Sequence, residues 1–403
     1  MGANSFLKQI LYIPFLPLKN NFKFISGVLL EALPSHYYYV IILLSSAIGE
    51  DWNLVQKGEI VSSKILDKEK LSYFVENLAK GHKVFAPVQR RSDVSFQEVS
   101  TAEMIKLDYK TTTLPPKKFF HYCEDLMTFK GDRFNVPQLD PKDTVLIFGV
   151  HSCDLNAILR QDRFFSREYD DPYYRRRREN SVIVALTCME AGDNCFCYSL
   201  GTGPTIKEGF DLLLTDIGEH YLIEVGSKKG EVIIKGHKLK DASTASHVKK
   251  DVKVKESIMT FKKSMKIEGL GELASSADNH DVWTLIGEKG GLSGCFACLS
   301  CGNCSLVCPS CYCYEVSDLV DLSLNGSVRR RELDSCQLLE YAQVALNGNF
   351  RADRKSRIRH WMRCKFGSAG GGIDSSCVGC GRCIHSCPAD IDLTEVAKNL
   401  WGE

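Results

Sequence analysis

The spacing of apolar residues in the first half of the chain predicts a sheet flanked by helices. Apolar residues recur at helical intervals from Leu71 to Leu78, and Gly81 stands where such a helix would end. A near-continuous apolar run at residues 144–150 is typical of a strand buried on both faces of a parallel or mixed sheet. Further strands are expected at residues 83–88, 96–99, 181–187 and 210–214, with a helix at 151–160 and a hairpin formed by 219–225 and 231–234.

The second half of the chain has a helical pattern instead. Residues 240–275 are rich in lysine and have the spacing of surface helices, and similar spacing recurs at 317–323, 332–346 and 353–363. We therefore expect an α/β N-terminal domain followed by an all-helical domain. The expected parts are an uncertain N-terminal extension at 1–60, the α/β domain at 61–238, a helical connector at 239–286 and the helical domain at 287–403.

Composition narrows the class of protein. The 403 residues are enough for two or three domains, and the hydrophobic fraction of 44% suits a globular chain. Because 51 basic residues balance 50 acidic ones, no global field would attract nucleic acid or an anionic membrane. The apolar stretch at residues 37–48 is too short to cross a bilayer, so no transmembrane segment is expected. The 18 cysteines, in a chain without a convincing secretory signal, indicate a reducing, cytoplasmic compartment.

Two groups of cysteines carry the strongest chemical signal. Each group has the spacing C-x2-C-x2-C-x3-C-P, one beginning at Cys298 and the other at Cys377. Such a loop wraps three thiolates around three corners of a 4Fe-4S cubane, and its fourth cysteine, before proline, binds the neighbouring cluster. Pro309 and Pro388 turn the chain sharply after that cysteine. The sequence therefore predicts two 4Fe-4S clusters.

The crossed arrangement assigns eight ligands. One cluster is expected to bind Cys298, Cys301, Cys304 and Cys387, and the other Cys377, Cys380, Cys383 and Cys308. Zinc is the alternative metal, but structural zinc sites use two separated cysteine pairs rather than a triple followed by a fourth cysteine before proline. The helical domain is accordingly expected to be a dicluster, ferredoxin-like domain in which exchanged ligands hold the clusters close together.

A second set of cysteines follows the strands of the α/β domain. Cys153 begins the helix after the strand at 144–150, and Cys188, Cys195 and Cys197 follow the next strand. These four thiols can meet at one edge of the sheet, where they would bind a third cluster or another metal, or stay reduced and inert. The remaining cysteines divide into candidates for contact with the clusters, Cys311, Cys313 and Cys336, and expected bystanders, Cys123, Cys295 and Cys364.

No nucleotide-binding motif is convincing. The glycine-rich segment at residues 287–294 runs directly into Cys295 instead of opening a helix, so it does not meet the requirements of a dinucleotide-binding fingerprint. The sequence contains no phosphate-binding loop and no nucleophile elbow. We therefore assign no catalytic residue and no nucleotide cofactor to this chain.

Several segments, taken with both cysteine groups, resemble a known family. They are LDY at residues 107–109, LPPKKFF at 114–120, GVHSCDL at 149–155, DPYY at 171–174, CFC at 195–197 and DSCQ at 334–337. From residue 65 to the C-terminus the chain resembles the beta subunit of soluble nickel-iron sulfhydrogenases and the related A subunit of anaerobic sulfite reductase. The resemblance implies the same eight cysteine ligands.

The resemblance also implies a function and partners. It describes an iron-sulfur subunit of a cytoplasmic complex that relays electrons between a flavin subunit handling NAD(P)H and a partner with the terminal site, either hydrogenase or sulfite reductase. FAD and NAD(P) would be bound by the partner subunit. The beta and gamma subunits of sulfhydrogenases are also credited with reducing elemental sulfur or polysulfide.

Three functions stay open at this point. The main interpretation is a non-catalytic electron-transfer subunit of an oxidoreductase complex. The alternative is a sulfur or polysulfide reductase component in which Cys153 takes up sulfane sulfur while the clusters deliver electrons. A zinc-stapled interaction module is the second alternative.

Overall fold

The computed structural model describes residues 60–137, 144–167, 169–276, 280–289, 297–367 and 376–402, which all belong to one compact unit formed by residues 54–403. The expected extension at 1–60, apart from its last residue, and the apolar stretch at 37–48 lie outside the described residues. Cys295 and most of the glycine-rich segment at 287–294 do so as well.

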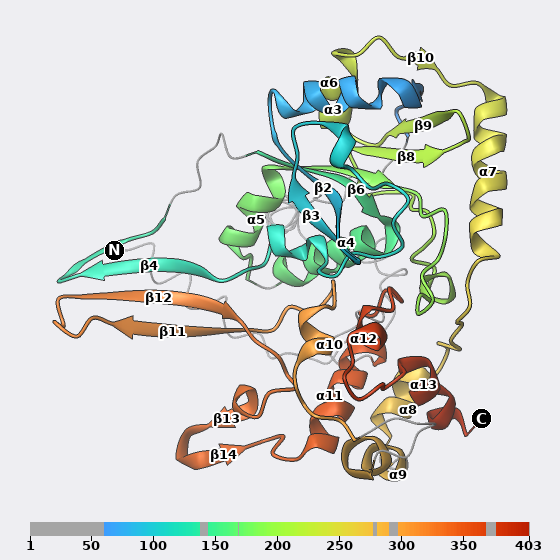
Figure 1. The fold of residues 1–403 in the computed structure, drawn as a ribbon. Helices are drawn as coiled ribbons and strands as arrows, with labels where there is room; N and C mark the ends of the chain where they lie inside the picture. The colour runs from blue at the N-terminus through green and yellow to red at the C-terminus, as the bar shows by residue number, and fades with distance from the viewer. Residues whose placement is uncertain are drawn as a thin grey trace, which may run out of the picture. The chain divides into compact units, whose positions relative to one another are not determined.

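The largest element of the fold is a mixed sheet of eight strands (Figure 1). Its order across the sheet is β10 (Lys240–Asp241), β1 (Ser62–Asp67), β9 (His220–Val225), β8 (Leu212–Asp216), β7 (Ser181–Leu186), β6 (Val145–His151), β2 (Lys83–Arg90) and β3 (Asp93–Glu98). The four central strands β8, β7, β6 and β2 run parallel, and the other pairs are antiparallel. Parallel central strands are buried on both faces, which explains the continuous apolar runs in the sequence.

Helices cover both faces of this sheet. Helix α3 (Leu71–Ala79) and helix α6 (Lys228–Lys235) contribute to the apolar cluster on one face, and α4 (Ser152–Phe165) and α5 (Pro172–Glu179) contribute to the cluster on the other. The long helix α7 (Thr244–Ile258) packs on β8 and β9. At the carboxyl ends of the central strands, β6 leads directly into α4, and β7 leads into the connection that contains Cys188, Cys195 and Cys197.

A bulge at Gly149 sets the position of the β6–α4 junction. Neighbours in a strand alternate between faces, yet Phe148 and Val150 pack in clusters on opposite faces, because the ladder shifts register between them. Gly149 has a φ of +79°, which favours glycine. After the bulge His151 stacks on Tyr109, with ring centroids 3.9 Å apart, and α4 begins at the next residue.

The sequence-based expectations for the sheet are mostly confirmed. The strands expected at 83–88, 96–99, 144–150, 181–187, 210–214 and 219–225 correspond to β2, β3, β6, β7, β8 and β9, and the expected helices correspond to α3 and α4. The second strand of the expected hairpin, at 231–234, is wrong, because these residues belong to α6. Ser227 caps this helix by accepting a hydrogen bond from the amide of Gly230, and Ile234 packs into the sheet cluster.

The expected all-helical C-terminal domain is wrong. Strands β11 (Tyr314–Val320) and β12 (Gly326–Leu333) join β4 (Glu124–Lys130) and β5 (Arg133–Asn135) in a four-stranded sheet, and β13 (Gln343–Val344) pairs with β14 (Gly348–Asn349). Of the helices expected at 317–323, 332–346 and 353–363, only the last is found, as α11 (Arg354–Phe366). The chain is therefore not an α/β domain followed by an all-helical one.

The hairpin that was missed carries a weak local signal. Its strands are joined by a turn at residues 321–325, in which Leu324 has a φ of +58°, and Gly326 already belongs to β12. Beyond the hairpin, β12 pairs with β4, which is contributed by a distant part of the chain. The spacing of apolar residues within a short segment carries no information about a pairing with a distant strand.

Short helices complete the cluster-bearing part. They are α8 (Leu270–Ser275), α9 (His280–Thr284), α10 (Asn303–Leu306), α12 (Arg382–His385) and α13 (Leu393–Trp401), with a π-helical turn at η5 (Leu285–Lys289). The 3-10 turns are η1 (Lys68–Lys70), η2 (Ala102–Met104), η3 (Pro116–Phe119), η4 (Cys197–Leu200), η6 (Glu340–Ala342) and η7 (Ala345–Asn347). Helices α8, α11 and α13 share one apolar cluster. Within the described residues, none of the helices has the length and apolar character needed to span a bilayer.

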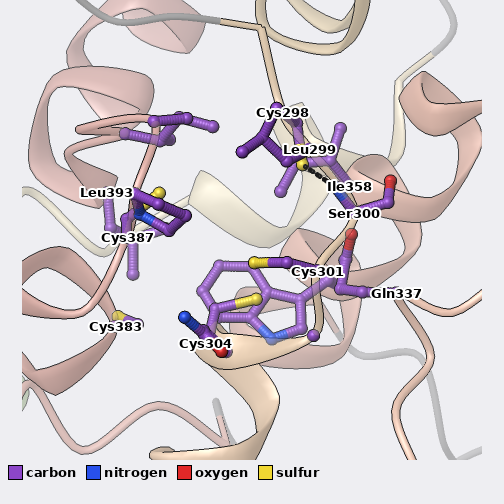
Figure 2. A pocket seen from close by; sticks show the side chains of 16 residues that line it. Cys298, Leu299, Ser300, Cys301, Cys304, Gln337, Ile358, Cys383, Cys387 and Leu393 are labelled. Atoms are coloured by element: carbon purple, nitrogen blue, oxygen red, sulfur yellow. Dashed lines mark hydrogen bonds between the residues drawn. The ribbon is translucent and has the colours of Figure 1, made fainter.

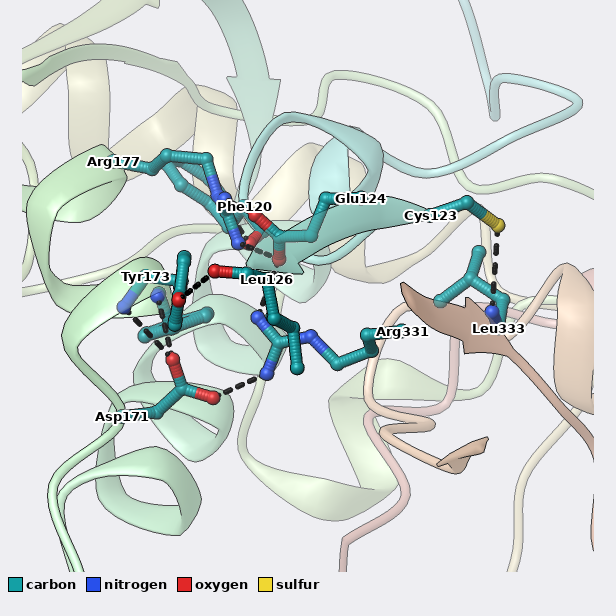
Figure 3. A network of polar contacts seen from close by, with 10 residues as sticks. Phe120, Cys123, Glu124, Leu126, Asp171, Tyr173, Arg177, Arg331 and Leu333 are labelled. Atoms are coloured by element: carbon teal, nitrogen blue, oxygen red, sulfur yellow. Dashed lines mark hydrogen bonds and ion pairs between the residues drawn. The ribbon is translucent and has the colours of Figure 1, made fainter. Parts of the chain in front are cut away.

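A buried ion network joins the four-stranded sheet to the large sheet's helices (Figure 3). Arg331 of β12 donates hydrogen bonds to the carboxylates of Glu124 on β4 and Asp171. Glu124 also accepts from Nη2 of Arg177 at 2.8 Å. Asp171 caps α5 by accepting from the amide of Tyr173 at 3.0 Å. The network therefore fixes the hairpin against α5.

We predict that Arg331→Ala destabilises the protein by about 3 kcal/mol, because the substitution leaves two largely buried carboxylates without one of their partners. The neighbouring Arg329→Ala is the matched control, since Arg329 pairs with Asp318 at the surface and its loss should change stability little. Denaturant unfolding of the three proteins measures the difference. Equal stability of the two variants would contradict the structural role given to Arg331.

Candidate iron-sulfur site

The first cysteine loop is tightly curled. Ser300 and Gly302 have φ values of +53° and +80°, and the amide of Ser300 donates to the Cys298 sulfur at 3.4 Å (Figure 2). Gly302 then begins α10, which carries Cys304. This backbone turns the three thiols of the loop toward a common volume, as a ferredoxin loop does.

That common volume is a pocket shared with the second loop. Cys298, Cys301 and Cys304 line it together with Cys387, which lies far away in the sequence (Figure 2). Its other walls are largely apolar, formed by residues such as Trp361. The cavity has a volume of ≈ 40 Å³, which exceeds the about 10–15 Å³ that one water needs. The donor set and the volume fit a group larger than a single ion.

The second set of thiols is more deeply buried. Cys377, Cys380 and Cys308 are each less than one-tenth exposed, and Cys383 is partly buried. Burial, with a smaller contribution from charge on Cys308, raises the pKa of Cys377 to about 12. A charge on Cys308 also raises the pKa of Cys380 and of Cys383, beside the larger effect of burial. Cys308 therefore lies near the thiols of the opposite loop. The assignment of the eight cysteines as ligands stays a prediction.

Two buried lysines lie beside Cys308. Lys117 Nζ donates to the carbonyl oxygen of Cys311 at 3.3 Å, and Lys365 Nζ donates to the hydroxyl of Ser310 at 3.2 Å. The pKa of Cys308 lies well below its usual range because the Cys311 thiol donates a hydrogen bond to it and because both lysines stabilise its charge, against the effect of burial. This cysteine is therefore favoured as a thiolate, the form that binds metal.

A single metal ion fits less well. Among the residues that the structure describes, no three His, Cys, Asp or Glu side chains are grouped as one ion would need them. Zinc binds four ligands at about 2.0–2.3 Å and would gather them tightly. Cysteines from both loops line this cavity, and an inorganic cluster has its own iron and sulfide atoms to occupy such a space. Such a cluster supplies one-electron redox chemistry when it is bound.

Comparison with known proteins agrees with this geometry. Residues 297–391 match the family model of the 4Fe-4S dicluster domain. The chain is also 38% identical over 339 residues to the sulfhydrogenase 2 subunit beta of Pyrococcus furiosus, an alignment that covers 83% of this chain and 97% of that one. The chain belongs to the sulfhydrogenase beta-subunit family. No solved structure matches it. The protein is therefore an iron-sulfur electron-transfer subunit of the oxidoreductase class.

In this sulfhydrogenase beta-family chain, the large sheet directly supports the second cysteine loop. Arg382, between Cys380 and Cys383, forms a bidentate ion pair with Asp154 of α4 at 2.6 and 2.8 Å. Its Nε donates to the carbonyl oxygen of Thr112 at 2.7 Å. Both charged groups are buried, so the pair satisfies donors and acceptors that water cannot reach.

The second loop also packs closely on the segment after β7. The amide of Phe196 donates to the carbonyl oxygen of Gly379 at 2.8 Å, and the Cys195 thiol donates to that of Cys380 at 3.5 Å. Gly379 has a φ of +63°, and a Cβ there would lie 2.6 Å from the Cys197 backbone. Glycine at 379 therefore permits the close approach of the two segments.

Sequence reasoning gave no role to two of the cations near the thiols. Lys117 and Arg382 are both buried, whereas basic residues in a sequence normally indicate a solvated surface. Arg382 offers one signal, because it stands inside a cysteine loop. Among the other cysteines, Cys311 contacts Cys308, Cys336 shares an apolar cluster with Cys298 and Cys377, and Cys123 is exposed.

We predict that Gly379→Ala both destabilises the protein and lowers its iron content, because the added methyl group forces the Cys197 segment away from the cysteine loop. Gly131→Ala is the matched control, since Gly131 has a similar φ of +59° but nothing within 4 Å of its Cβ position. Backbone strain alone costs roughly 1–2 kcal/mol at either site. Urea unfolding and iron analysis test the prediction, which fails if the two variants behave alike.

Proposed function

We propose that this subunit relays electrons between a flavin subunit that handles NAD(P)H and a nickel-iron hydrogenase partner. Two 4Fe-4S clusters, bound in the crossed arrangement by the eight predicted cysteines, would carry the electrons. The observation that supports this most strongly is Cys387, which lines one pocket with Cys298, Cys301 and Cys304. Cys383, a predicted ligand of the other cluster, lines the same pocket, so the two clusters would lie next to each other.

The surroundings of the thiols support a redox role for the clusters. A cluster bound by four thiolates is anionic, and its potential depends on nearby charges, hydrogen bonds and solvent. Lys117 and Lys365 lie next to Cys308, and Arg382 lies next to Cys380. Buried positive charge stabilises the more negative, reduced form of a cluster. The three cations would therefore raise the potential of the cluster bound by Cys377, Cys380, Cys383 and Cys308.

The name of the Pyrococcus furiosus relative, a subunit beta of a sulfhydrogenase, supports a heteromeric complex. That name supports a hydrogenase partner, while a sulfite reductase partner rests on the wider resemblance. Because this chain offers no convincing dinucleotide fingerprint, FAD and NAD(P) would be bound by another subunit. The 18 cysteines fit a cytoplasmic, reducing environment.

Direct sulfur reduction at Cys153 is less well supported. A thiol that takes up sulfur must be accessible and partly ionised. Cys153 is only 7% exposed. Burial raises its pKa well above the usual value, and Asp154 and Cys197 raise it further. As a free thiol it is therefore poorly suited to nucleophilic chemistry.

Crossed ligation predicts which substitutions affect the same cluster. Cys387→Ala should change the electron paramagnetic resonance spectrum of the reduced protein in the same way as Cys298→Ala, because both substitutions remove a ligand of one cluster. Cys308→Ala should instead reproduce the spectrum of Cys377→Ala. Each variant should lose up to about four irons per chain. The exposed Cys123 supplies the control, and Cys123→Ala should keep the parent spectrum.

The opposite matching would contradict the crossed arrangement. If Cys387→Ala reproduces Cys377→Ala, each loop binds its own fourth cysteine. If none of these substitutions changes the iron content, the eight cysteines are not ligands.

The partners can be identified by purifying the tagged full-length chain anaerobically from its native cells. A flavoprotein and a nickel-containing protein should copurify with it, and NAD(P)H should then reduce its clusters only in the complex. A sirohaem protein in place of the nickel protein would support sulfite reductase as the partner. Reduction of the isolated chain by NAD(P)H would overturn the assignment of the flavin to a partner.

A further inference from the structure

Four cysteines outside the two loops meet at the carboxyl edge of the large sheet. Cys153 lies in the first turn of α4, directly after β6. Cys188 follows β7 by two residues, and Cys195 and Cys197 come later in the same connection. Because β6 and β7 are parallel neighbours, both connections leave the sheet at the same edge. The four thiols thus come from two segments that the sheet topology brings together.

The thiols are buried and close to one another. Cys153, Cys195 and Cys197 are each less than one-tenth exposed, and Cys188 is partly exposed. Burial raises the pKa of Cys197, and charges on Cys195 and Cys188 would raise it further. A charge on Cys197 would in turn raise the pKa of Cys153, beside the larger effects of burial and Asp154. Cys153 and Cys197 also share a small apolar cluster with Cys380 of the second loop.

The backbone around these thiols is shaped to hold them. The amide of Cys188 donates to the carbonyl oxygen of Pro204 at 3.0 Å, which closes the long connection after β7. The amide of Cys195 donates to the carbonyl oxygen of Gly192 at 2.9 Å in a tight turn. A Cβ at Gly203 would lie only 2.5 Å from the Cys197 sulfur. The loop thus approaches the thiols more closely than a side chain would allow.

We propose that Cys153, Cys188, Cys195 and Cys197 bind a third iron-sulfur cluster, of the 4Fe-4S class. Four thiolates complete the ligand set of a cubane, and each thiol would release its proton as it binds iron. This site is additional to the two-cluster relay and shares no ligand with it.

Arg382 of the second loop is a buried cation that lies near thiols of both sites. The charge of Arg382 interacts with Asp154 most strongly, and then with Cys380 and Cys153, against the cost of burial. Two anionic clusters on either side of a guanidinium repel each other less than they would without it. The ion pair with Asp154 also fixes the guanidinium in place.

The position of the site gives the relay an order. The pocket of Cys298 also contains Cys383 of the second loop, and Cys380 of that loop contacts Cys195. A third cluster would therefore follow the cluster of the second loop and extend the electron path to the edge of the sheet. Cys188, the least buried of the four thiols, would lie on the outer side of this path.

Iron analysis of the full-length protein, purified anaerobically, tests the proposal. The parent protein should contain about twelve irons, as three 4Fe-4S clusters require, and the double variant Cys195→Ala, Cys197→Ala should contain about eight. The spectrum of the reduced variant should keep the signals that Cys298→Ala and Cys377→Ala each abolish. Cys123→Ala, which removes an exposed thiol outside the three sets, should keep all of the parent's iron.

The result that overturns the third cluster is a parent with about eight irons and a double variant that keeps them. The two-cluster relay would survive that result, so the two proposals fail separately. If the double variant does not fold, Cys188→Ala decides, because a partly exposed position tolerates truncation better. Iron content and spectrum unchanged in Cys188→Ala would refute the site, and loss of up to about four irons would support it.

Discussion

The fold depends on burying thiols where the large sheet meets the cluster-bearing segments. A buried thiolate without compensation is costly, and the raised pKa values of Cys304 and Cys377, both to about 12 and both caused first by burial, express that cost. Iron at these positions would supply the missing positive charge. Metal binding and folding would then stabilise each other, because the loops that present the thiols are also the segments that pack the junction.

Fixed cations and glycines make such a junction workable. Arg382 connects the second cysteine loop to α4 through Asp154, and Lys365 and Lys117 approach Cys308 from two distant parts of the chain. Gly379 allows the loop to touch the backbone of the Cys197 segment. Charges held in place by packing need not reorganise when an electron arrives. This rigidity is an advantage for electron transfer over the mobile charges of a protein surface.

The part of this arrangement that could be predicted from sequence is the part encoded locally. The spacing around Cys298 and Cys377 predicts cluster loops, and the apolar run ending at Val150 predicts the central strand of the large sheet. The all-helical expectation was wrong because the segment around β11 and β12 is stabilised by pairing with β4, from another part of the chain. The lysine and arginine partners of the thiols are equally nonlocal, because only the fold brings Lys117 to Cys311.

The pairing of β4 with β12 also bears on how the relay is assembled. The four-stranded sheet takes strands from both halves of the chain, and Arg331 connects it to the cap of α5. The two cysteine loops lie on either side of β11 and β12 in the sequence, so their approach depends on how the intervening chain folds back. Strand pairing and buried ion pairs, and not the loops alone, would then set the distance between the two proposed clusters. A sheet is stiffer than a linker, and the rate of electron transfer falls steeply with distance. A junction held by strand pairing would therefore keep the distance between the clusters, and with it the transfer rate, nearly unchanged.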